Sequence, residues 1–317
     1  MSSYYTSERL IESVKRRMNI PTNQNTFDDT DILAFADEEL SLAILPAIMS
    51  LHEDYLLFSE DIPMVDGQSE YEIPYRAVGN KLYDLQFVNA DGGVQYMSRS
   101  TLADQPSFNG RYTLNSAYAY YIKNNKIGVM PTLGGATTGT LRFIYYIRAS
   151  SLVKTPDIAV ITSIDTTTGE ILVSNIPDTF STNTRLDFYK VKSPHNILEI
   201  DVIPSLVNTT TKSLTFSVND IPTELEVGDH IALAQECAIP QIPSDLHVFL
   251  AQKTAERILE AQGDVEGLNI AKQKSAEMEV RAGTIIDNRV DESPTKLVNR
   301  RGILRSGLIS RLYRRRG

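Results

Sequence analysis

The stretch TFDDTDILAFADEELSLAILPAIMSLHEDY, from Thr26 to Tyr55, carries the strongest helical signal in the chain. Asp28 and Asp29 stand at its start, where negative charge suits the positive end of a helix dipole. Pro46 lies inside the pattern and has no N–H to donate, so we expect a kink or break near residues 42–45. The apolar residues recur at the spacing of one helix face: Ile32, Ala36, Leu40, Ala43 and Ile44.

Three further helices are predicted toward the two ends of the chain. Ser7 can cap a helix that runs to about Asn19 and stops before Pro21. Ser244 can cap another that ends at Gly263, and one over about residues 264–282 follows almost at once. The short connection implies an antiparallel pair. We expect the N-terminal helices to complete an antiparallel helical bundle with this pair, which makes the intervening β region an insertion.

Between the helices, short β-type runs alternate with turn signals. Asn124-Asn125 predicts a hairpin, and the run from Gly139 to Ser150 alternates apolar and polar residues as a half-buried strand does. A second β stretch, residues 158–234, indicates a small barrel or sandwich. We therefore predict an α+β fold with a large inserted antiparallel β region made of one or two small barrels or sandwiches. The predicted division is N-terminal helices 1–61, first β segment 62–155, second β segment 156–240, helical hairpin 241–287 and extended tail 288–317.

The tail is basic, whereas the rest of the chain is acidic. Residues 288–317 hold nine Arg or Lys against two Asp or Glu, a charge of +7, so residues 1–287 hold −16 of the formal total of −9. Pro294, Gly302 and Gly307 break this segment, and its scattered apolar residues are too few to form a core. The tail is either a solvated terminus or, as the apolar residues among the arginines favour, a segment that orders on a partner.

The sequence gives little sign of catalytic chemistry. The four histidines show no zinc-ligand spacing, and no HExxH, CxxC, GxSxG, phosphate-binding or dinucleotide-binding loop is present. We predict no catalytic residue, no metal, no cofactor and no enzymatic activity. No apolar run approaches the ~20 residues of a membrane span, no signal peptide is evident, and Cys237 alone cannot form an internal disulfide.

The acidic residues Asp37, Glu38 and Glu39 fall on the predicted second helix. Close carboxylates can do acid–base work, but on an amphipathic helix they more often form the solvated face. An acidic contact with another subunit is the second interpretation, and these three residues are the candidates for it.

The quoted stretch, with IPMVDGQSEYEIPYRAVGNKLYDLQFV and IPQIPSDLHVFLAQKTAERILEAQGD, resembles the head–tail connector (adaptor) proteins of tailed bacteriophages. The resemblance covers about residues 5–60 and 240–300 and the first β segment. It implies a portal-binding ring, commonly of twelve copies, with a β insertion in a helical bundle around a DNA channel. It also implies a virion protein, made in the bacterial host cytoplasm, whose C-terminal segment docks on the portal.

The implied partners are the portal protein, neighbouring copies of the same chain, the next ring or tail-tube component, and passing double-stranded DNA read without sequence specificity; no membrane is expected. The tail would supply apolar anchors and arginines suited to desolvated, forked contacts. The residues expected to dock on the portal are Leu297, Arg300, Arg301, Ile303, Leu304, Arg305, Leu308, Ile309, Arg311, Leu312, Tyr313, Arg314, Arg315 and Arg316.

Two other functions stay open at this point. A nucleic-acid-binding protein could use the basic arm on phosphates, with an affinity that falls steeply with salt. A β-rich tail enzyme acting on glycans would need two opposed carboxylates in an aromatic cleft, and the sequence singles out no such pair.

Overall fold

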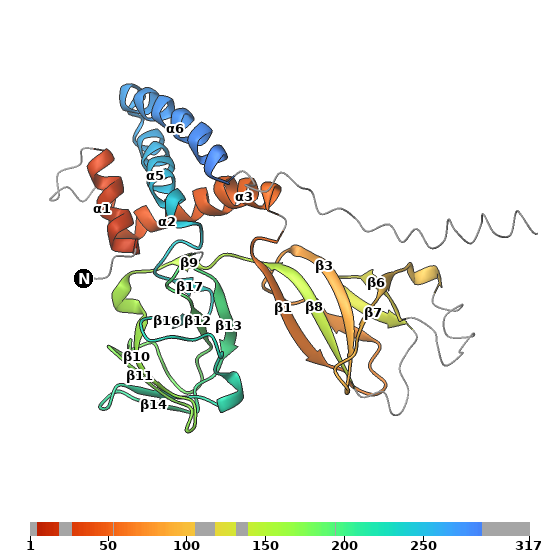
Figure 1. Cartoon of the computed structure of the whole chain (residues 1–317). Coiled ribbons are helices and arrows are strands. Elements are labelled where there is room, and N and C mark those ends of the chain that lie inside the picture. The colour runs from red at the N-terminus through yellow and green to blue at the C-terminus, as the bar shows by residue number, and fades with distance from the viewer. Residues whose placement is uncertain are drawn as a thin grey trace, which may run out of the picture.

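The computed structural model describes residues 5–18, 27–52, 54–104, 118–130, 139–193 and 195–286. These residues form three parts (Figure 1): a helical part, a first β unit over residues 57–147 and a second β unit over residues 151–237. The chain passes from the first N-terminal helices into the first β unit, then the second, and returns to helices. The α+β class is therefore confirmed.

Local signals set both N-terminal helices. Helix α1 (Ser7–Arg17) buries Leu10, Ile11 and Val14 on one face, and its last turn is basic, which suits the negative end of the helix dipole. Helix α2 (Asp29–Glu39) begins with a capping box in which Asp28 accepts from the Asp31 N–H and Asp31 accepts from the Asp28 N–H. These reciprocal bonds satisfy two donors at the start of the helix.

The break predicted near residues 42–45 is confirmed as a turn of π-helix, η1 (Leu40–Ile44), before α3 (Leu45–Leu51). The Leu45 N–H donates to the Leu40 carbonyl, five residues back. Pro46 has no N–H for the Leu42 carbonyl and its ring crowds that carbonyl, so the wider turn relieves the conflict. Leu42 is left 78% exposed.

Helix α5 (His247–Gln262) follows a short 3-10 turn, η5 (Ser244–Leu246). Ser244 begins that turn and makes no side-chain cap, so the predicted serine cap is wrong. Gly263 ends α5 with a left-handed φ of 74°, as predicted, because glycine reaches that region without Cβ strain. Helix α6 (Val265–Ile286) then runs back beside α5, four residues further than predicted.

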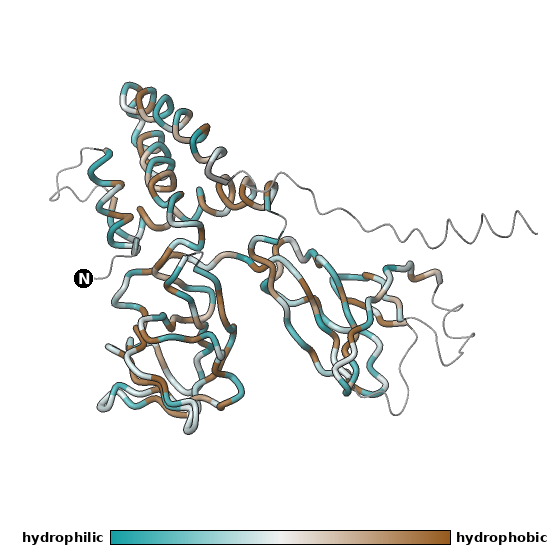
Figure 2. The backbone as a smooth tube through the Cα atoms, in the orientation of Figure 1, coloured by the Kyte–Doolittle hydropathy of each residue, from teal (hydrophilic) through white to brown (hydrophobic). Residues whose placement is uncertain are grey.

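Helix α5 is the centre of the helical part, since it packs against α1, α2 and α6. One apolar core joins residues of all these helices with η1 and α3. Figure 2 shows apolar positions recurring along the helices and alternating along the strands. The apolar patterns seen in the sequence therefore account for which faces are buried.

In the first β unit, two four-stranded sheets share one core, with orders β1-β8-β3-β4 and β2-β7-β6-β5. The alternation predicted for β8 is confirmed: Leu141, Phe143, Tyr145 and Ile147 are buried. Asn124 and Asn125 turn β6 into β7 with positive φ angles, as the hairpin prediction required. The strands are β1 (Leu57–Pro63), β2 (Glu70–Glu72), β3 (Ala77–Asn89), β4 (Val94–Tyr96), β5 (Ser98–Arg99), β6 (Ala119–Lys123), β7 (Lys126–Met130) and β8 (Gly139–Ile147), with the 3-10 turn η2 (Leu102–Asp104).

In the second β unit, seven strands pair in the order β13-β12-β16-β10-β11-β15-β14. Over the described residues this sheet is open, so the closed barrel considered from the sequence is not formed there. The strands are β9 (Ser151–Leu152), β10 (Ala159–Asp165), β11 (Glu170–Val173), β12 (Leu186–Tyr189), β13 (Ile197–Val202), β14 (Leu206–Asn208), β15 (Ser213–Thr215), β16 (His230–Leu233) and β17 (Glu236–Cys237), with 3-10 turns η3 (Thr155–Asp157) and η4 (Val218–Asp220). A separate parallel pair, β17 with β9, lies between this sheet and the helices (Figure 1).

Candidate functional site at the junction of the three parts

Arg76 crosses from the first β unit into the second. It lies in the turn between β2 and β3, and its guanidinium forms two parallel hydrogen bonds to Asp187 of β12, at 2.6 and 2.8 Å. A third bond, of 3.0 Å, reaches Asp201 of β13. The Arg76 and Asp187 side chains are 1% and 0% exposed. We call the group Tyr75, Arg76, Asp187 and Asp201 the ionic latch.

Asp187 accepts more than the two bonds from Arg76. The Tyr189 hydroxyl donates to it at 2.8 Å, and the Asp201 and Gln235 backbone N–H groups donate at 2.9 Å each. A buried carboxylate is costly unless its lone pairs are satisfied, and here five donors satisfy them. Asp187 therefore organises the local backbone as well as neutralising Arg76.

Electrostatics hold Arg76 in its charged form. Burial opposes the charge, but the hydrogen bonds and charge of Asp187 outweigh it and raise the pKa of Arg76.

Tyr75 adds bonds of 2.7 Å to both oxygens of Asp201, whose backbone takes a positive φ of 56°. Burial, with the charge of Asp201 nearby, raises the pKa of Glu60 on β1. The latch thus joins the β2–β3 turn, β12 and β13 around one cation.

The helices contact the second β unit through a different set of hydrogen bonds and an ion pair. Both oxygens of Asp37 accept from the Leu152 N–H at 3.0 Å, and Glu8 accepts from the Thr155 N–H at 2.5 Å and from its hydroxyl. Asp29 pairs with Lys154 at 3.1 Å, and the Ser7 N–H donates to the Ala238 carbonyl. We call these four contacts the helix–β seam.

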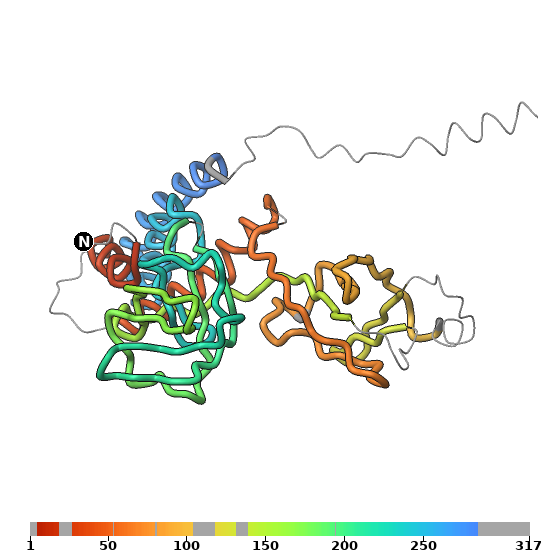
Figure 3. The backbone as a smooth tube through the Cα atoms, turned by 60° about the horizontal axis from the view of Figure 1, so that its bottom comes forward, coloured from red at the N-terminus to blue at the C-terminus, as the bar shows by residue number. Residues whose placement is uncertain are grey.

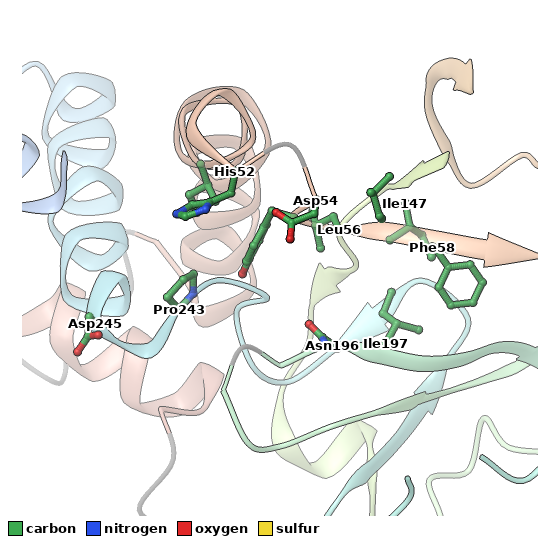
Figure 4. A pocket seen from close by; sticks show the side chains of 12 residues that line it. His52, Asp54, Leu56, Phe58, Ile147, Asn196, Ile197, Pro243 and Asp245 are labelled. Atoms are coloured by element: carbon green, nitrogen blue, oxygen red, sulfur yellow. The ribbon is translucent and has the colours of Figure 1, made fainter. Parts of the chain in front are cut away.

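An open cavity of about 460 Å³ lies where the three parts meet. Figure 4 shows His52, Leu56 and Phe58 on one side of it and Asn196, Ile197 and Pro243 on the other. Leu56 links the helices to β1 with a φ of 61°, a left-handed conformation that costs a residue with a Cβ some strain. The strained linker beside a cavity marks the place where the first β unit joins the rest.

A comparison with known protein families identifies the family of this chain. The sequence profile described as SU10 adaptor protein matches residues 5–184. The chain belongs to the SU10 adaptor protein family. No curated protein matches the chain. The predicted bacteriophage adaptor is thus confirmed at the level of the family: the chain is a phage structural adaptor and a virion component, of a family that is generally non-enzymatic.

The match spans α1 to α3, the whole first β unit and the start of the second. Both carboxylates of the seam from α2, Asp29 and Asp37, fall inside it, as does Arg76 of the ionic latch. Asp187 and Asp201 lie beyond it. In this adaptor, the latch therefore connects the matched region to strands that the profile does not reach.

The predicted acidic contact residues have distinct surroundings. Asp37 is largely enclosed at the seam, and this burial raises its pKa to about 7. Glu38 is exposed and lies 3.8 Å from Arg257 of α5, while burial raises the pKa of Glu39 against the opposing charges of Lys253 and Arg257. All three carboxylates have partners within the adaptor chain. Contact with another subunit stays a prediction.

The predicted portal-docking residues, from Leu297 to Arg316, lie outside the described residues. Across the described ranges, no three His, Cys, Asp or Glu side chains are grouped to hold a metal ion, and no helix is long and apolar enough to cross a membrane.

Sequence reasoning missed the ionic latch. Arg76 and Asp187 are 111 positions apart and neither belongs to a motif. The one available signal was an arginine next to Pro74-Tyr75 within an otherwise strand-like stretch.

Proposed function

We propose that this adaptor forms a ring, of about twelve copies as the family resemblance implies, that joins the portal to the tail and lines part of the DNA channel. Membership of the SU10 adaptor family carries the proposal. The helices would form the bundle that packs against neighbouring copies, with α5 at its centre and the β units projecting from it. From a second direction, Figure 3 shows the first β unit apart from the other two parts, which overlap in that view.

The C-terminal tail is proposed to dock on the portal. It begins two residues after Ile286, the last residue of α6, and its 30 residues, 288–317, are available for an extended arm. At about 3.3–3.6 Å per residue such an arm reaches on the order of 100 Å. Its +7 charge and interspersed leucines suit a partner surface that is both acidic and apolar. Docking of many tails at once would multiply a modest individual affinity.

The acidic body supports a channel through which DNA slides. Residues 1–287 carry −16, and like charge keeps the phosphate backbone from being gripped. Glu38 is the exposed member of the acidic group on α2 and is proposed, with Asp37 and Glu39 behind it, as part of the contact between neighbouring copies.

Truncation after Asn288 tests the docking proposal. The shortened protein should stay folded and should no longer join portal rings, as native mass spectrometry of the mixture would show. Full-length protein under the same conditions is the control. Normal joining by the truncated protein would overturn the role of the tail.

Two matched tail variants separate portal docking from nucleic-acid binding. Leu304, Leu308 and Leu312 changed to Ser should weaken docking more than Arg314, Arg315 and Arg316 changed to Gln, because the apolar anchors would be buried on the portal. The complex should also survive moderate salt. The opposite ranking, with loss of the complex as salt rises, would favour the nucleic-acid-binding alternative.

A further inference from the structure

Three of the four histidines gather where the helical part meets the second β unit. His247 is the first residue of α5, His230 begins β16, and His195 lies in the loop between β12 and β13. Their exposed fractions are 0%, 7% and 2%. The His195 and His247 rings stack with centroids 5.3 Å apart, and Tyr5, just before α1, packs on His247 at 5.0 Å. We call these three residues the histidine cluster.

Geometry fixes the protonation of His247. Its Nε2 lies 3.1 Å from the carbonyl oxygens of Pro240 and Ile242, which can only accept, so Nε2 carries a proton. Its Nδ1 is buried and has no hydrogen-bond partner. A second proton on Nδ1 would place an uncompensated charge in the interior. The contact between the helical part and the second β unit, which we call the joint, therefore requires a neutral His247.

The other two rings face similar constraints. His195 Nε2 contacts the Ser244 hydroxyl at 3.2 Å, and the left-handed backbone of His195, with a φ of 65°, directs the loop into the joint. His230 has a buried Nδ1 without a partner. Protonation of His195 and His247 together would also bring two positive charges into one stack. Opening the joint to water would relieve each of these costs.

The charged and titratable groups around the cluster come from every adjoining element. Asp229 and Glu8 favour a proton on His230, while His195 disfavours it, and burial dominates, lowering the pKa of His230 to about 4. Burial, and then the charge of His195, lowers the pKa of His247 to about 4. Asp229 is itself engaged by the Val191 and Glu226 N–H groups and by Lys190. The carboxylates of the nearby seam are Asp37, whose pKa is raised by burial, and Glu8 and Asp29, whose pKa values are lowered by their hydrogen bonds.

We propose that the histidine cluster makes the joint between the helical part and the second β unit a proton-responsive contact, which opens on acidification while both parts keep their own cores. The core of the seven-stranded sheet is separate from the core of the helices, to which Leu152 of β9 also belongs, so the sheet can part from the helices without unfolding. The cluster joins them through side chains that tolerate only the neutral state. This device is independent of ring formation and of portal docking.

Linkage gives the sign and size of the effect. A histidine whose folded pKa is lowered stabilises the closed joint above its ordinary pKa, and that stability is lost as pH falls toward the folded value. With folded pKa values of about 4 and an ordinary value near 6.5, His230 and His247 should each favour opening about 20-fold more at pH 5 than at pH 7.

Asp37 acts in the opposite direction. Its raised pKa means that protonation on acidification strengthens the closed joint, by about 50-fold over the same interval if opening exposes the Asp37 carboxyl to water. Two histidines at about 20-fold each, offset by about 50-fold from Asp37, should make opening of the natural protein about tenfold more favourable at pH 5 than at pH 7. Asp37→Asn removes the offset and should raise this ratio to a few hundred-fold.

The chain carries its own reporter of opening. Cys237 is the only cysteine, it is 2% exposed, and it lies in β17 beside the joint. Burial raises the pKa of its thiol to about 12, so its reaction with 4,4′-dithiodipyridine, a reagent that works in acid, measures exposure. The rate for the full-length protein, divided by that of a free thiol at each pH, reports the opening equilibrium. Far-UV circular dichroism at the same pH reports whether both parts stay folded.

Glutamine variants test the histidines, because the Gln amide can replace the Nε2 donor and does not titrate. The triple variant His195→Gln, His230→Gln, His247→Gln should lose the acid-driven rise in labelling. His230→Gln alone should remove a factor of about 20, which turns the natural tenfold rise into a slight fall. His52→Gln, at the fourth histidine outside the cluster, should respond like the natural protein. If the triple variant fails to fold, the single variant in the Asp37→Asn background decides the question.

The proposal is overturned by any of three results. The first is a flat labelling profile between pH 7 and 5 in both the natural protein and Asp37→Asn. The second is an effect of His52→Gln as large as that of His230→Gln. The third is loss of circular dichroism in step with labelling, which would show global unfolding instead of a separation of intact parts.

Discussion

The two β units are attached to the rest of the molecule in different ways. The second unit meets the helices along the helix–β seam, where Asp37, Glu8 and Asp29 each bind a different residue between Leu152 and Thr155. The first unit joins through two chain crossings, through Ile197 and Ile200, which pack on its core, and through Tyr75 and Arg76. Of these contacts, the Arg76 guanidinium carries the buried charge into the second unit. Loss of one seam contact should therefore cost little stability, whereas loss of the one buried cation should cost much more.

The largest expected effect comes from removing that cation. Arg76→Ala leaves Asp187 buried without its counter-ion, and breaking a buried pair in this way costs about 3–5 kcal/mol. Urea unfolding of the variant and the natural protein measures the loss. Arg142→Ala, which breaks the well-aligned but half-exposed pair with Asp61, is the control. A loss below 1 kcal/mol for Arg76→Ala would remove the distinction between the two attachments.

Replacing both charges sharpens the comparison. Arg76→Met with Asp187→Leu removes the ion pair, a change that is often neutral when only the pair is at stake. Here the Asp201 and Gln235 N–H groups and the Tyr189 hydroxyl lose their acceptor. Unsatisfied buried donors cost about 1–3 kcal/mol each, so the double variant should stay at least about 2 kcal/mol less stable than the natural protein. Equal stability of the two proteins would show that Asp187 serves Arg76 alone.

The seam should respond to pH through Asp37. Its folded pKa of about 7 lies above its ordinary value of 3.8, so the penalty of ionising the carboxylate in the fold grows as pH rises from about 4 and is complete above 7. Asp37→Asn keeps an acceptor for Leu152 and should be more stable at pH 8 by about 2–4 kcal/mol, with an advantage below about 1 kcal/mol near pH 4. Thermal melts at the two pH values provide the measurement. An advantage that is the same at both would exclude titration of Asp37 as the cause.

A smaller effect of opposite sign is expected at Glu8. The pKa of this carboxylate is lowered because the hydrogen bonds from Thr155 outweigh its burial, so it stabilises the fold above its ordinary value of 4.5 and the gain is lost as pH falls through the lower folded value. Glu8→Gln should cost roughly 1 kcal/mol at pH 7 and less at pH 3. Denaturation at both pH values, with the exposed Glu12→Gln of the same helix as control, tests this.

Local chemistry explains which parts of the fold could be predicted from sequence. Pro46 disturbs its own helix, Gly263 ends one and Asn124 turns a hairpin, so their effects are readable within a few residues. The latch and the histidine cluster depend on residues brought together from distant positions. The open sheet of the second β unit shows a related limit, because alternation predicts strands but does not tell whether the first and last of them meet.

The candidate site also has features that could be predicted from sequence and features that could not. The acidic helix α2 was recognised from its composition, but composition could not show that Asp37 faces Leu152 while Glu38 faces Arg257. Those partners come from β9 and α5, more than a hundred residues further along the chain. Side-chain direction on a helix is predictable from sequence, whereas the identity of what it meets is not.

The pairing of β1 with β8 affects how the first β unit can be altered during evolution. Leu57 and Tyr146 are opposed in the ladder, so the chain enters and leaves the first β unit at neighbouring points. A module with adjacent ends can be lengthened, exchanged or excised, and a short loop can close the gap it leaves. The helices and second β unit can thus persist while the inserted module is exchanged for another that also supplies a cation to Asp187.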